Sequence, residues 1–465
     1  MHDKRQPMLP SPGGPRLTRP PAGRSAPLCP RMFSRSLLRR RRFYGLLAVF
    51  GLALYYFRIL RGLPLPVSGY ESFFEKELGD ARYTAEGENN NRYLHFKIKS
   101  YPRADEALAG LYLYAHLAHA SNRAYVFDPL EPVPLGKYQM WWSRKKVVPL
   151  TAIIDTGKNW DGNDSKLKPM SSLGWSQVCS RRKRTVLHVT PQDLSEAKYS
   201  PASLMNIWAS KLKGLDAQCV EVVGELFTDR VLEYPSIQPF FDTIATSPIL
   251  KHYTFSYKVY NAASAIIPAS STLQAVPTAN DTVVLQAHLP PRPSTSLPPE
   301  DPCGALASLG APFRAFAHLR GLPTPFDLPA AATYYAQRCN PTVSELVGRL
   351  GSLRIAFPSS DSSPTNPTSR LKHVYVVDGP MGLTPAEWSH RKRWFEQLKY
   401  ELTNKQGWNS VRWARAGAKP ESVAIDMEVA ASAEAFVGNG FSDFSSNVVL
   451  LRIARGKEKG SIRFV

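Results

Sequence analysis

The stretch from Val423 to Arg455 constrains the fold of this chain most strongly, because it predicts a helix, a strand, a tight turn and a second helix in succession. Alanine and other apolar residues recur at helical spacing over residues 423–434. A short apolar strand is expected at residues 435–437. Residues 438–440 (Gly-Asn-Gly) then predict a tight turn, since glycine accepts backbone angles that other residues avoid. This order is typical of an α/β domain.

A strand that leads through a glycine-rich turn into a capped helix forms an anion site. The free backbone N–H groups and the helix dipole both favour a phosphate there. Ser445 or Ser446 is expected to cap the second helix. An ordinary strand-to-helix turn with a serine cap is the alternative interpretation. A dinucleotide-binding fingerprint is rejected, because Asp443 stands where its third glycine belongs and too little chain follows.

The same stretch carries a long pattern of residues made up of Asp426, Phe436-Val437-Gly438-Asn439, Ser442, Phe444-Ser445-Ser446-Asn447-Val448 and Leu451-Arg452. This pattern resembles the C-terminal motif of the GDP-fucose protein O-fucosyltransferase superfamily, especially its fungal membrane-anchored members. The resemblance implies that Asp426 helps to hold the guanine of GDP. It also implies that Ser445 and Ser446 hold the β-phosphate, with Phe444 beside them.

The N-terminal region predicts a membrane anchor. Residues 1–42 carry eleven Lys or Arg and one acidic residue, half of the chain's net charge of +20, so a disordered basic cytosolic tail is expected. Residues 43–60 are apolar apart from Arg58, at the short end of what spans a bilayer core of about 30 Å. The run lies too far from the N-terminus for a cleaved signal peptide, and no small-residue cleavage site follows. We therefore predict a single-pass type II signal-anchor.

The rest of the chain is then expected in the lumen of the Golgi or endoplasmic reticulum, and a short span fits a thin membrane. Residues 61–91 would form a luminal stem. Two Rossmann-like domains are expected to follow, at residues 92–275 and 276–465, facing each other across a cleft in the GT-B arrangement. This α/β architecture combines the strand and helix patterns with the family resemblance.

The first of these domains opens with a strand–helix–strand pattern. Residues 93–98 alternate like a strand, residues 105–120 have an apolar helical face, and residues 123–127 form the next strand. Such a unit is the beginning of a parallel sheet. Residues 201–243 are expected to be mainly helical. The small, polar and proline-containing segment 261–280 marks the boundary between the domains.

A strand predicted at residues 282–289 marks where the sequence departs from the family. In the family such a strand ends in His-x-Arg-Arg-Gly-Asp, and its first Arg is the main catalytic residue that eases the departure of GDP. His288 aligns and is implied in nucleotide-sugar binding, but Pro290 stands in place of that Arg. Arg292 is only a weak substitute, so no catalytic residue is assigned. The family's glycine and asparagine loop is also replaced, by residues 101–106.

Four cysteines follow the predicted anchor, which suits two disulfides in an oxidising compartment. They are Cys179, Cys219, Cys303 and Cys339. Three pairings are open. We favour Cys179–Cys219 with Cys303–Cys339, because each bridge then stays within one domain. Asn163 and Asn280 begin sequons that would be glycosylated in the lumen.

The sequence contains no Asp-x-Asp motif and no His/Cys cluster with metal-ligand spacing, so nucleotide-sugar binding without a metal or other cofactor is expected. No nucleic-acid-binding module is recognisable. The resemblance implies transfer of fucose from GDP-fucose, or of another sugar from a related GDP-sugar, to a protein or glycan hydroxyl with inversion. The alternative is a catalytically inactive, membrane-anchored pseudoenzyme or scaffold that retains the fold and GDP binding.

Overall fold

The computed structural model describes residues 44–52, 65–66, 68–86, 91–98, 104–130, 146–156, 167–198, 200–227, 238–267, 278–286, 341–359, 369–377, 385–414, 420–439 and 442–464. The chain divides into two compact units, Met1–Leu63 and Pro64–Val465. In the first unit, residues 44–52 are helical. No helix among the described residues is both long and apolar enough to cross a membrane. Residues 53–60 of the predicted anchor lie outside that part.

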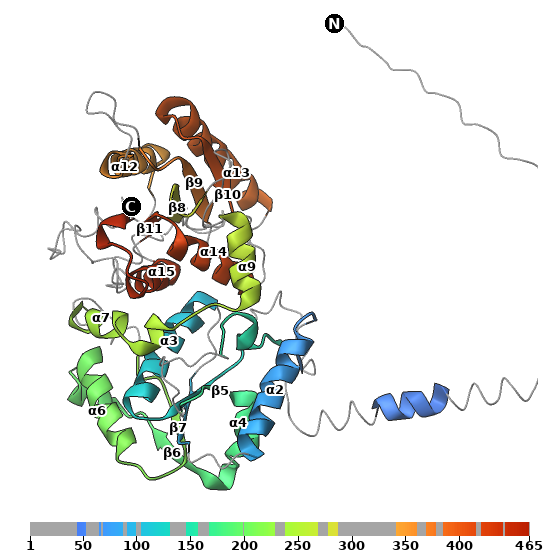
Figure 1. The fold of residues 1–465 in the computed structure, drawn as a ribbon. Coiled ribbons are helices and arrows are strands. Elements are labelled where there is room, and N and C mark those ends of the chain that lie inside the picture. The colour runs from blue at the N-terminus through green and yellow to red at the C-terminus, as the bar shows by residue number, and fades with distance from the viewer. Residues whose placement is uncertain are drawn as a thin grey trace, which may run out of the picture. The chain divides into compact units, whose positions relative to one another are not determined.

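A parallel sheet of five strands, in the order β5-β3-β2-β7-β6, organises the N-terminal half (Figure 1). Its strands are β2 (Tyr93–Lys97), β3 (Ala124–Phe127), β5 (Met170–Ser171), β6 (Arg184–His188) and β7 (Cys219–Val223). Helix α3 (Ala104–Ala120) connects β2 to β3, which lie side by side and parallel. The predicted strand–helix–strand unit is therefore confirmed.

Helices and short elements surround this sheet. They are α2 (Glu71–Glu86), α4 (Ser172–Val178), α5 (Pro191–Glu196), α6 (Pro201–Lys213), α7 (Gln238–Ala245), α8 (Pro248–Lys251), the turns η1 (Leu150–Ala152) and η2 (Arg181–Lys183), and the small parallel pair β1 (Leu65–Pro66) and β4 (Lys146–Val147). Helix α9 (Tyr257–Ile266) follows them and packs against the helix Pro420–Ser432 of the C-terminal half. Residues of β2, β3 and β7 alternate between the two faces of the sheet. Leu94 and Val220 pack with α3 and α6, while Tyr93 and Cys219 pack with α4.

The prediction that residues 201–243 are mainly helical is wrong in one place. Strand β7 pairs with β2 on one side and β6 on the other, near the middle of the sheet. Its sequence, Cys-Val-Glu-Val-Val, is a short, buried, β-branched run. Such a run cannot be told from a buried helical segment by periodicity alone. Its valines favour a strand.

A second parallel sheet of five strands, in the order β10-β9-β8-β11-β12, organises the C-terminal half. Its strands are β8 (Thr282–Gln286), β9 (His373–Val377), β10 (Ser410–Trp413), β11 (Ala435–Gly438) and β12 (Ile462–Phe464). The other elements are α12 (Val343–Ala356), α13 (Pro385–Tyr400), the π-helical turn η3 (Glu401–Lys405), α14 (Pro420–Ser432), α15 (Asp443–Ala454) and η4 (Lys459–Ser461). The structure is thus an α/β fold with two parallel sheets, as expected.

Helices cover both faces of the C-terminal sheet. Val283 of β8 and Val374 of β9 pack with Leu346 of α12, whereas Val284 belongs to the cluster that contains α14 and α15. Because these strands are buried on both faces, their sequences are mostly apolar and do not alternate with polar residues, which is characteristic of parallel sheets.

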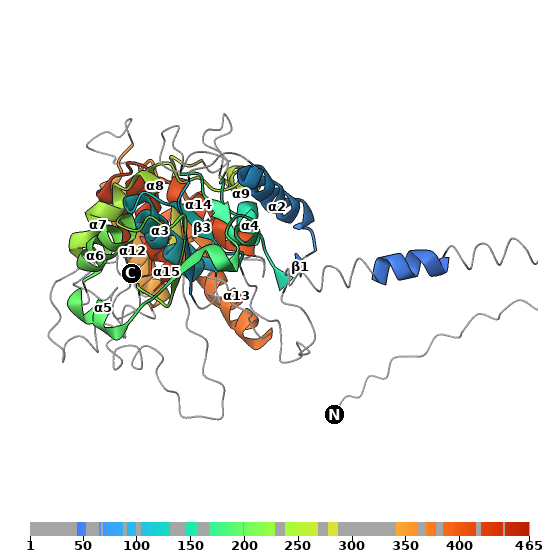
Figure 2. The ribbon, with the colours of Figure 1, turned by 90° about the horizontal axis from the view of Figure 1, so that it is seen from below.

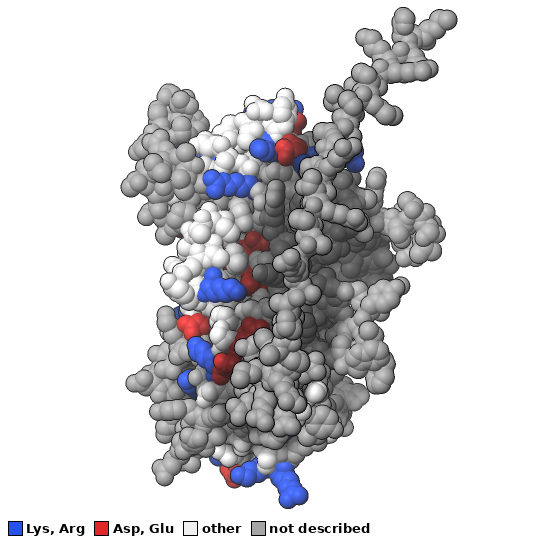
Figure 3. Space-filling model, turned by 90° about the vertical axis from the view of Figure 1, so that its right-hand side faces the viewer, with Lys and Arg blue, Asp and Glu red and all other residues white. Residues whose placement is uncertain are grey.

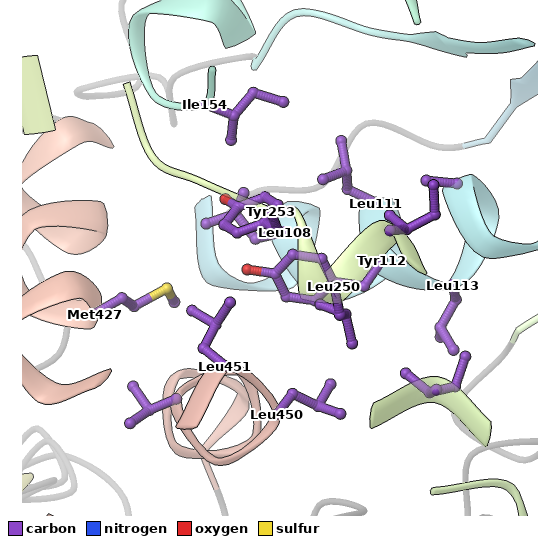
Figure 4. Close-up of a cluster of buried hydrophobic side chains, with 14 of the residues drawn as sticks. Leu108, Leu111, Tyr112, Leu113, Ile154, Leu250, Tyr253, Met427, Leu450 and Leu451 are labelled. Carbon is purple, nitrogen blue, oxygen red and sulfur yellow. The ribbon is translucent and has the colours of Figure 1, made fainter. Parts of the chain in front are cut away.

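One apolar core connects the helices of the two halves. Figure 4 shows Tyr112 of α3 near Leu451 of α15, with Met427 of α14 beside Leu451. In Figure 1, α14 and α15 lie between the C-terminal sheet and α3, and both contact α3. The interface between these helices is therefore a continuous hydrophobic core.

Helix α2 lies in the segment predicted as a stem, and it packs against α4 (Figure 2). Its Phe74 is buried, and the buried carboxylate of Glu77 accepts hydrogen bonds from Thr151 and Ser171. The predicted disulfide between Cys179 and Cys219 is present and joins the end of α4 to the start of β7. Cys303 and Cys339 lie outside the described residues.

Candidate functional site

The candidate site lies where the strand order of the C-terminal sheet reverses. From β8 the chain passes to β9 and β10 on one side, whereas β11 and β12 lie on the other. In open parallel sheets, ligands bind at the carboxyl ends of the two strands that flank such a reversal. Here those ends are Gln286 of β8 and Gly438 of β11, and α15 begins five residues after β11 ends.

Helix α15 starts earlier than expected. It begins at Asp443 with Ser442 as the N-cap residue, so Ser445 and Ser446 lie inside the helix and do not cap it. The reason is that Ser442 already has the extended backbone of a cap residue (φ −114°, ψ 127°). The sequence offered three serines within five positions, and the pattern alone could not select between them.

The hydroxyl of Ser442 does not cap the helix that it precedes. At the start of six other helices, the equivalent hydroxyl accepts a hydrogen bond from a backbone N–H of the first turn. Those residues are Ser171, Thr190, Ser200, Ser247, Ser256 and Thr342. Ser442 therefore leaves the first-turn N–H groups of residues 443–445 without a hydroxyl cap, in the arrangement that suits an anion.

Two of the serine hydroxyls, those of Ser442 and Ser445, form hydrogen bonds with Gln286. Its amide nitrogen donates to Ser442 Oγ over 2.6 Å, and its amide oxygen accepts from Ser445 Oγ. Ser445 Oγ in turn accepts from the backbone N–H of Asn439 over 2.8 Å. Gln286, Ser442 and Ser445 are all at least 95% buried. This hydrogen-bonded cluster fixes the turn after β11 against the end of β8.

Gly438 makes the close packing of this turn possible. A Cβ atom at residue 438 would lie 2.7 Å from Ser445 Oγ and 2.8 Å from the ring of Phe436. Both distances are shorter than real Cβ contacts, so a side chain here would push α15 away from β11. The requirement for glycine is steric and comes from its missing side chain.

Asp426 of α14 is buried and faces the C-terminal sheet, where the hydroxyl of Tyr375 on β9 donates to its Oδ1 over 3.5 Å. Burial, and then the neighbouring Asp426 carboxylate, raise the pKa of Tyr375 above its ordinary value. Tyr375 therefore stays protonated and remains a donor. A buried carboxylate needs such partners, because an unpaired charge in the interior is costly.

The remaining predicted residues of α15 are also buried. Phe444 packs into the core that the two halves share, and Ser446 Oγ donates to the carbonyl of Ser442 over 3.3 Å. The next residue, Asn447, donates from its side chain to the carbonyl of Asp105 at the start of α3 over 2.7 Å. Phe444 and Asn447 thus hold the start of α15 against the N-terminal half, and the Ser446 hydroxyl is engaged within the start of the helix.

Several predicted residues fall outside the described part of the chain, namely His288, Pro290, Arg292, Cys303, Cys339 and Asn163. Asn280 is described, and it is exposed in the turn that precedes β8. Gln286 was not predicted as a site residue. The available signal was a single amide at the end of the otherwise apolar strand Thr-Val-Val-Leu-Gln.

The described residues hold no group of three or more His, Cys, Asp or Glu side chains that could bind a metal ion. A small pocket of about 10 Å³, lined in part by His119, Arg123 and Tyr125, lies on the N-terminal half and has room for about one water molecule. Its lining includes neither Gln286 nor any residue of α15, so we give it no part in the candidate site. On the face shown in Figure 3, basic side chains lie among acidic ones.

No protein-family model matches the sequence, and no curated protein does. Solved structures that match include POFUT1 in complex with GDP-fucose, with a TM-score of 0.47 and 12% identity over 80% of this chain and 98% of that one. POFUT1 in complex with GDP gives a TM-score of 0.46 and 12% identity over 80% and 98%. A mutant of Arabidopsis thaliana FUT1 in complex with GDP gives 0.35 and 10% over 83% and 78%.

Proposed function

We propose that this chain is a fucosyltransferase-like protein of the GT-B type whose C-terminal half binds GDP-fucose or a related GDP-sugar. One observation carries the proposal: the uncapped start of α15 lies at the carboxyl ends of β8 and β11, where the strand order reverses. The diphosphate would accept hydrogen bonds from the backbone N–H groups of residues 443–445. The Asp426 carboxylate, on the neighbouring helix, is the proposed acceptor for the guanine.

Catalysis by this site would transfer fucose to a protein or glycan hydroxyl with inversion at the anomeric carbon. The family's catalytic arginine would stabilise the charge that develops on the departing GDP, and Pro290 occupies its position in this sequence. That substitution favours the second candidate function, a pseudoenzyme or scaffold that binds GDP without turnover. The two candidates share the nucleotide site and differ only in chemistry.

Base selectivity tests the nucleotide site. The affinity of the full chain for GDP is compared with that for ADP, in the wild type and in Asp426→Asn. The proposal expects the wild type to prefer GDP, and the variant to lose most of that preference while its thermal unfolding changes little. Equal affinity for both nucleotides in the wild type would overturn the guanine assignment. Release of free fucose from GDP-fucose then separates an enzyme from a pseudoenzyme.

We also propose that residues 43–60 anchor the chain in a Golgi or endoplasmic reticulum membrane as a single-pass type II protein with a luminal C-terminal part. The basic residues before position 43 support this orientation. Glycosylation at Asn163 and the exposed Asn280 would follow. Removal of N-glycans should reduce the apparent mass of the wild type, whereas the double variant Asn163→Gln/Asn280→Gln should not shift. An unglycosylated wild type in a carbonate-soluble fraction would overturn the proposal.

A further inference from the structure

We propose that Gln286 is a positioning residue that keeps the start of α15 open to an anion by holding the Ser442 hydroxyl away from it. This inference rests on the proposed nucleotide site and adds a residue that neither the motif nor the family resemblance includes. The side-chain amide of Gln286 contacts both Ser442 and Ser445.

Ser442 has everything that an N-cap residue needs. It directly precedes α15, its backbone is extended, and its hydroxyl is buried. Serine in this place normally accepts a hydrogen bond from the N–H group two or three residues later. In this structure its oxygen accepts from the Gln286 amide over 2.6 Å instead.

The two contacts of Gln286 work together. Its oxygen is occupied by Ser445, and Ser445 is held by the Asn439 N–H, so the amide cannot rotate without breaking a second hydrogen bond. Its nitrogen is thereby aimed at Ser442. Because its amide oxygen accepts and its amide nitrogen donates, Gln286 makes both contacts through one planar group. Asparagine is one methylene shorter.

The N–H groups of residues 443–445 can bind either the Ser442 hydroxyl or a phosphate oxygen. If Gln286 did not hold Ser442, its hydroxyl would be free to cap the helix and would compete with a phosphate oxygen for residues 443–445. A serine cap contributes about 1 kcal/mol, which corresponds to roughly a fivefold change in affinity. Gln286 therefore prevents the Ser442 hydroxyl from capping α15 and leaves the N–H groups of residues 443–445 available to a ligand.

The experiment compares wild type, Gln286→Leu, Ser442→Ala and the double variant in the full chain, with two readouts. The first is amide hydrogen exchange of residues 443–445, and the second is the dissociation constant for GDP. We expect Gln286→Leu to slow exchange in this turn and to weaken GDP binding about fivefold. The double variant has no hydroxyl left to cap the helix, so it should recover the exchange rate and the affinity of Ser442→Ala.

Gln406→Leu is the matched control. Gln406 is a partly buried glutamine of the same half, and its amide donates to the Val347 carbonyl, away from α15. Its loss should change neither readout. If Gln286→Leu does not fold, Gln286→Asn gives the same test, because the shorter side chain cannot reach both serines.

The outcomes separate this inference from the proposed function. Unchanged exchange and unchanged GDP affinity in Gln286→Leu would overturn the role of Gln286 and leave the nucleotide site intact. A weakening that the double variant fails to reverse would also overturn it, since the effect would not act through Ser442. A wild type that binds no GDP, while exchange still slows in Gln286→Leu and recovers in the double variant, would overturn the proposed function alone.

Discussion

Arg123 and Arg452 have the same role in the two halves of the structure: each is a fully buried guanidinium that donates hydrogen bonds to carbonyls at the C-terminal end of a helix. Arg123 binds the carbonyls of Leu212, Leu215 and Ala217 at and after the end of α6. Arg452 binds those of Ala430, Ala433 and Glu434 at and after the end of α14, and Ser461 Oγ. The negative end of a helix dipole favours a cation at both places.

Removing Arg452 should destabilise the C-terminal half strongly. Burial lowers the pKa of Arg452 to about 10, so it stays charged at neutral pH, and its loss leaves several buried acceptors without a donor. We expect Arg452→Met to reduce the free energy of unfolding by at least about 3 kcal/mol, measured by urea denaturation. Arg463→Met, which removes an exposed guanidinium of β12, is the control and should cost less than about 0.5 kcal/mol. Similar losses in the two variants would contradict this account.

Mild acid should destabilise the protein through His116. Its Nδ1 lies 2.7 Å from Ser247 Oγ, and burial, followed by the nearby His119, lowers the pKa of His116 to about 4. An unfolded histidine takes up its proton near pH 6.5. The stability that His116 contributes is therefore complete above about pH 6.5 and is lost as the pH falls towards 4.

The expected loss over that range is roughly 2–3 kcal/mol. It should show in urea midpoints measured between pH 7 and pH 4. His116→Gln should flatten this part of the stability profile, whereas His390→Gln, at an exposed position of α13, should not. A wild-type profile that is already flat over this interval would show that His116 does not resist protonation.

Gly438→Ala should damage the turn after β11, because the added Cβ would collide with Ser445 Oγ and with Phe436. We expect a loss of about 1–3 kcal/mol in the free energy of unfolding, together with weaker GDP binding. Gly348→Ala is a matched control in the interior of α12, where a Cβ would meet nothing within 4 Å. That substitution should stabilise the protein by up to about 1 kcal/mol. A Gly438→Ala protein as stable as the wild type would mean that the turn is not tightly packed.

The Cys179–Cys219 bridge closes a loop with a sequence separation of 40 residues. In the chain-entropy model, a loop of this length contributes about 4 kcal/mol. Cys179→Ala/Cys219→Ala should therefore unfold at a lower urea concentration than the wild type. Peptide mapping without reductant should find residue 179 linked to residue 219, and also Cys303 linked to Cys339. A bridge between the two halves of the chain would contradict this pairing.

The sequence predicted the parts of the fold whose patterns are long. Helix α3 and strand β11 appear in the structure nearly where they were expected, whereas the predicted turn at residues 438–440 lies partly outside the described residues. Strand β7 was missed, because five buried residues carry no usable period. The starting residue of α15 was also missed. Three serines could each have capped it, and only the tertiary contact with Gln286 decides what Ser442 does.

In the candidate site, too, the sequence predicted the local pattern but not the contacts between distant residues. The motif placed Asp426, Ser445 and Ser446 near one turn, but it predicted serine hydroxyls directed at a phosphate. Ser445 Oγ contacts Gln286 and the Asn439 N–H, and our proposal therefore assigns anion binding to the backbone N–H groups. No local pattern could predict this, because Gln286 and Ser445 are 159 residues apart in sequence.

Calorimetric titration of the full chain with GDP and with GDP-fucose, in the presence of a chelator and then of a divalent metal ion, is the decisive test of the nucleotide site. We expect saturable one-to-one binding of both ligands that the chelator does not abolish. We also expect ADP to bind more weakly. Absence of binding to either guanine ligand, with and without metal, would contradict the claim that the uncapped start of α15 is a nucleotide site.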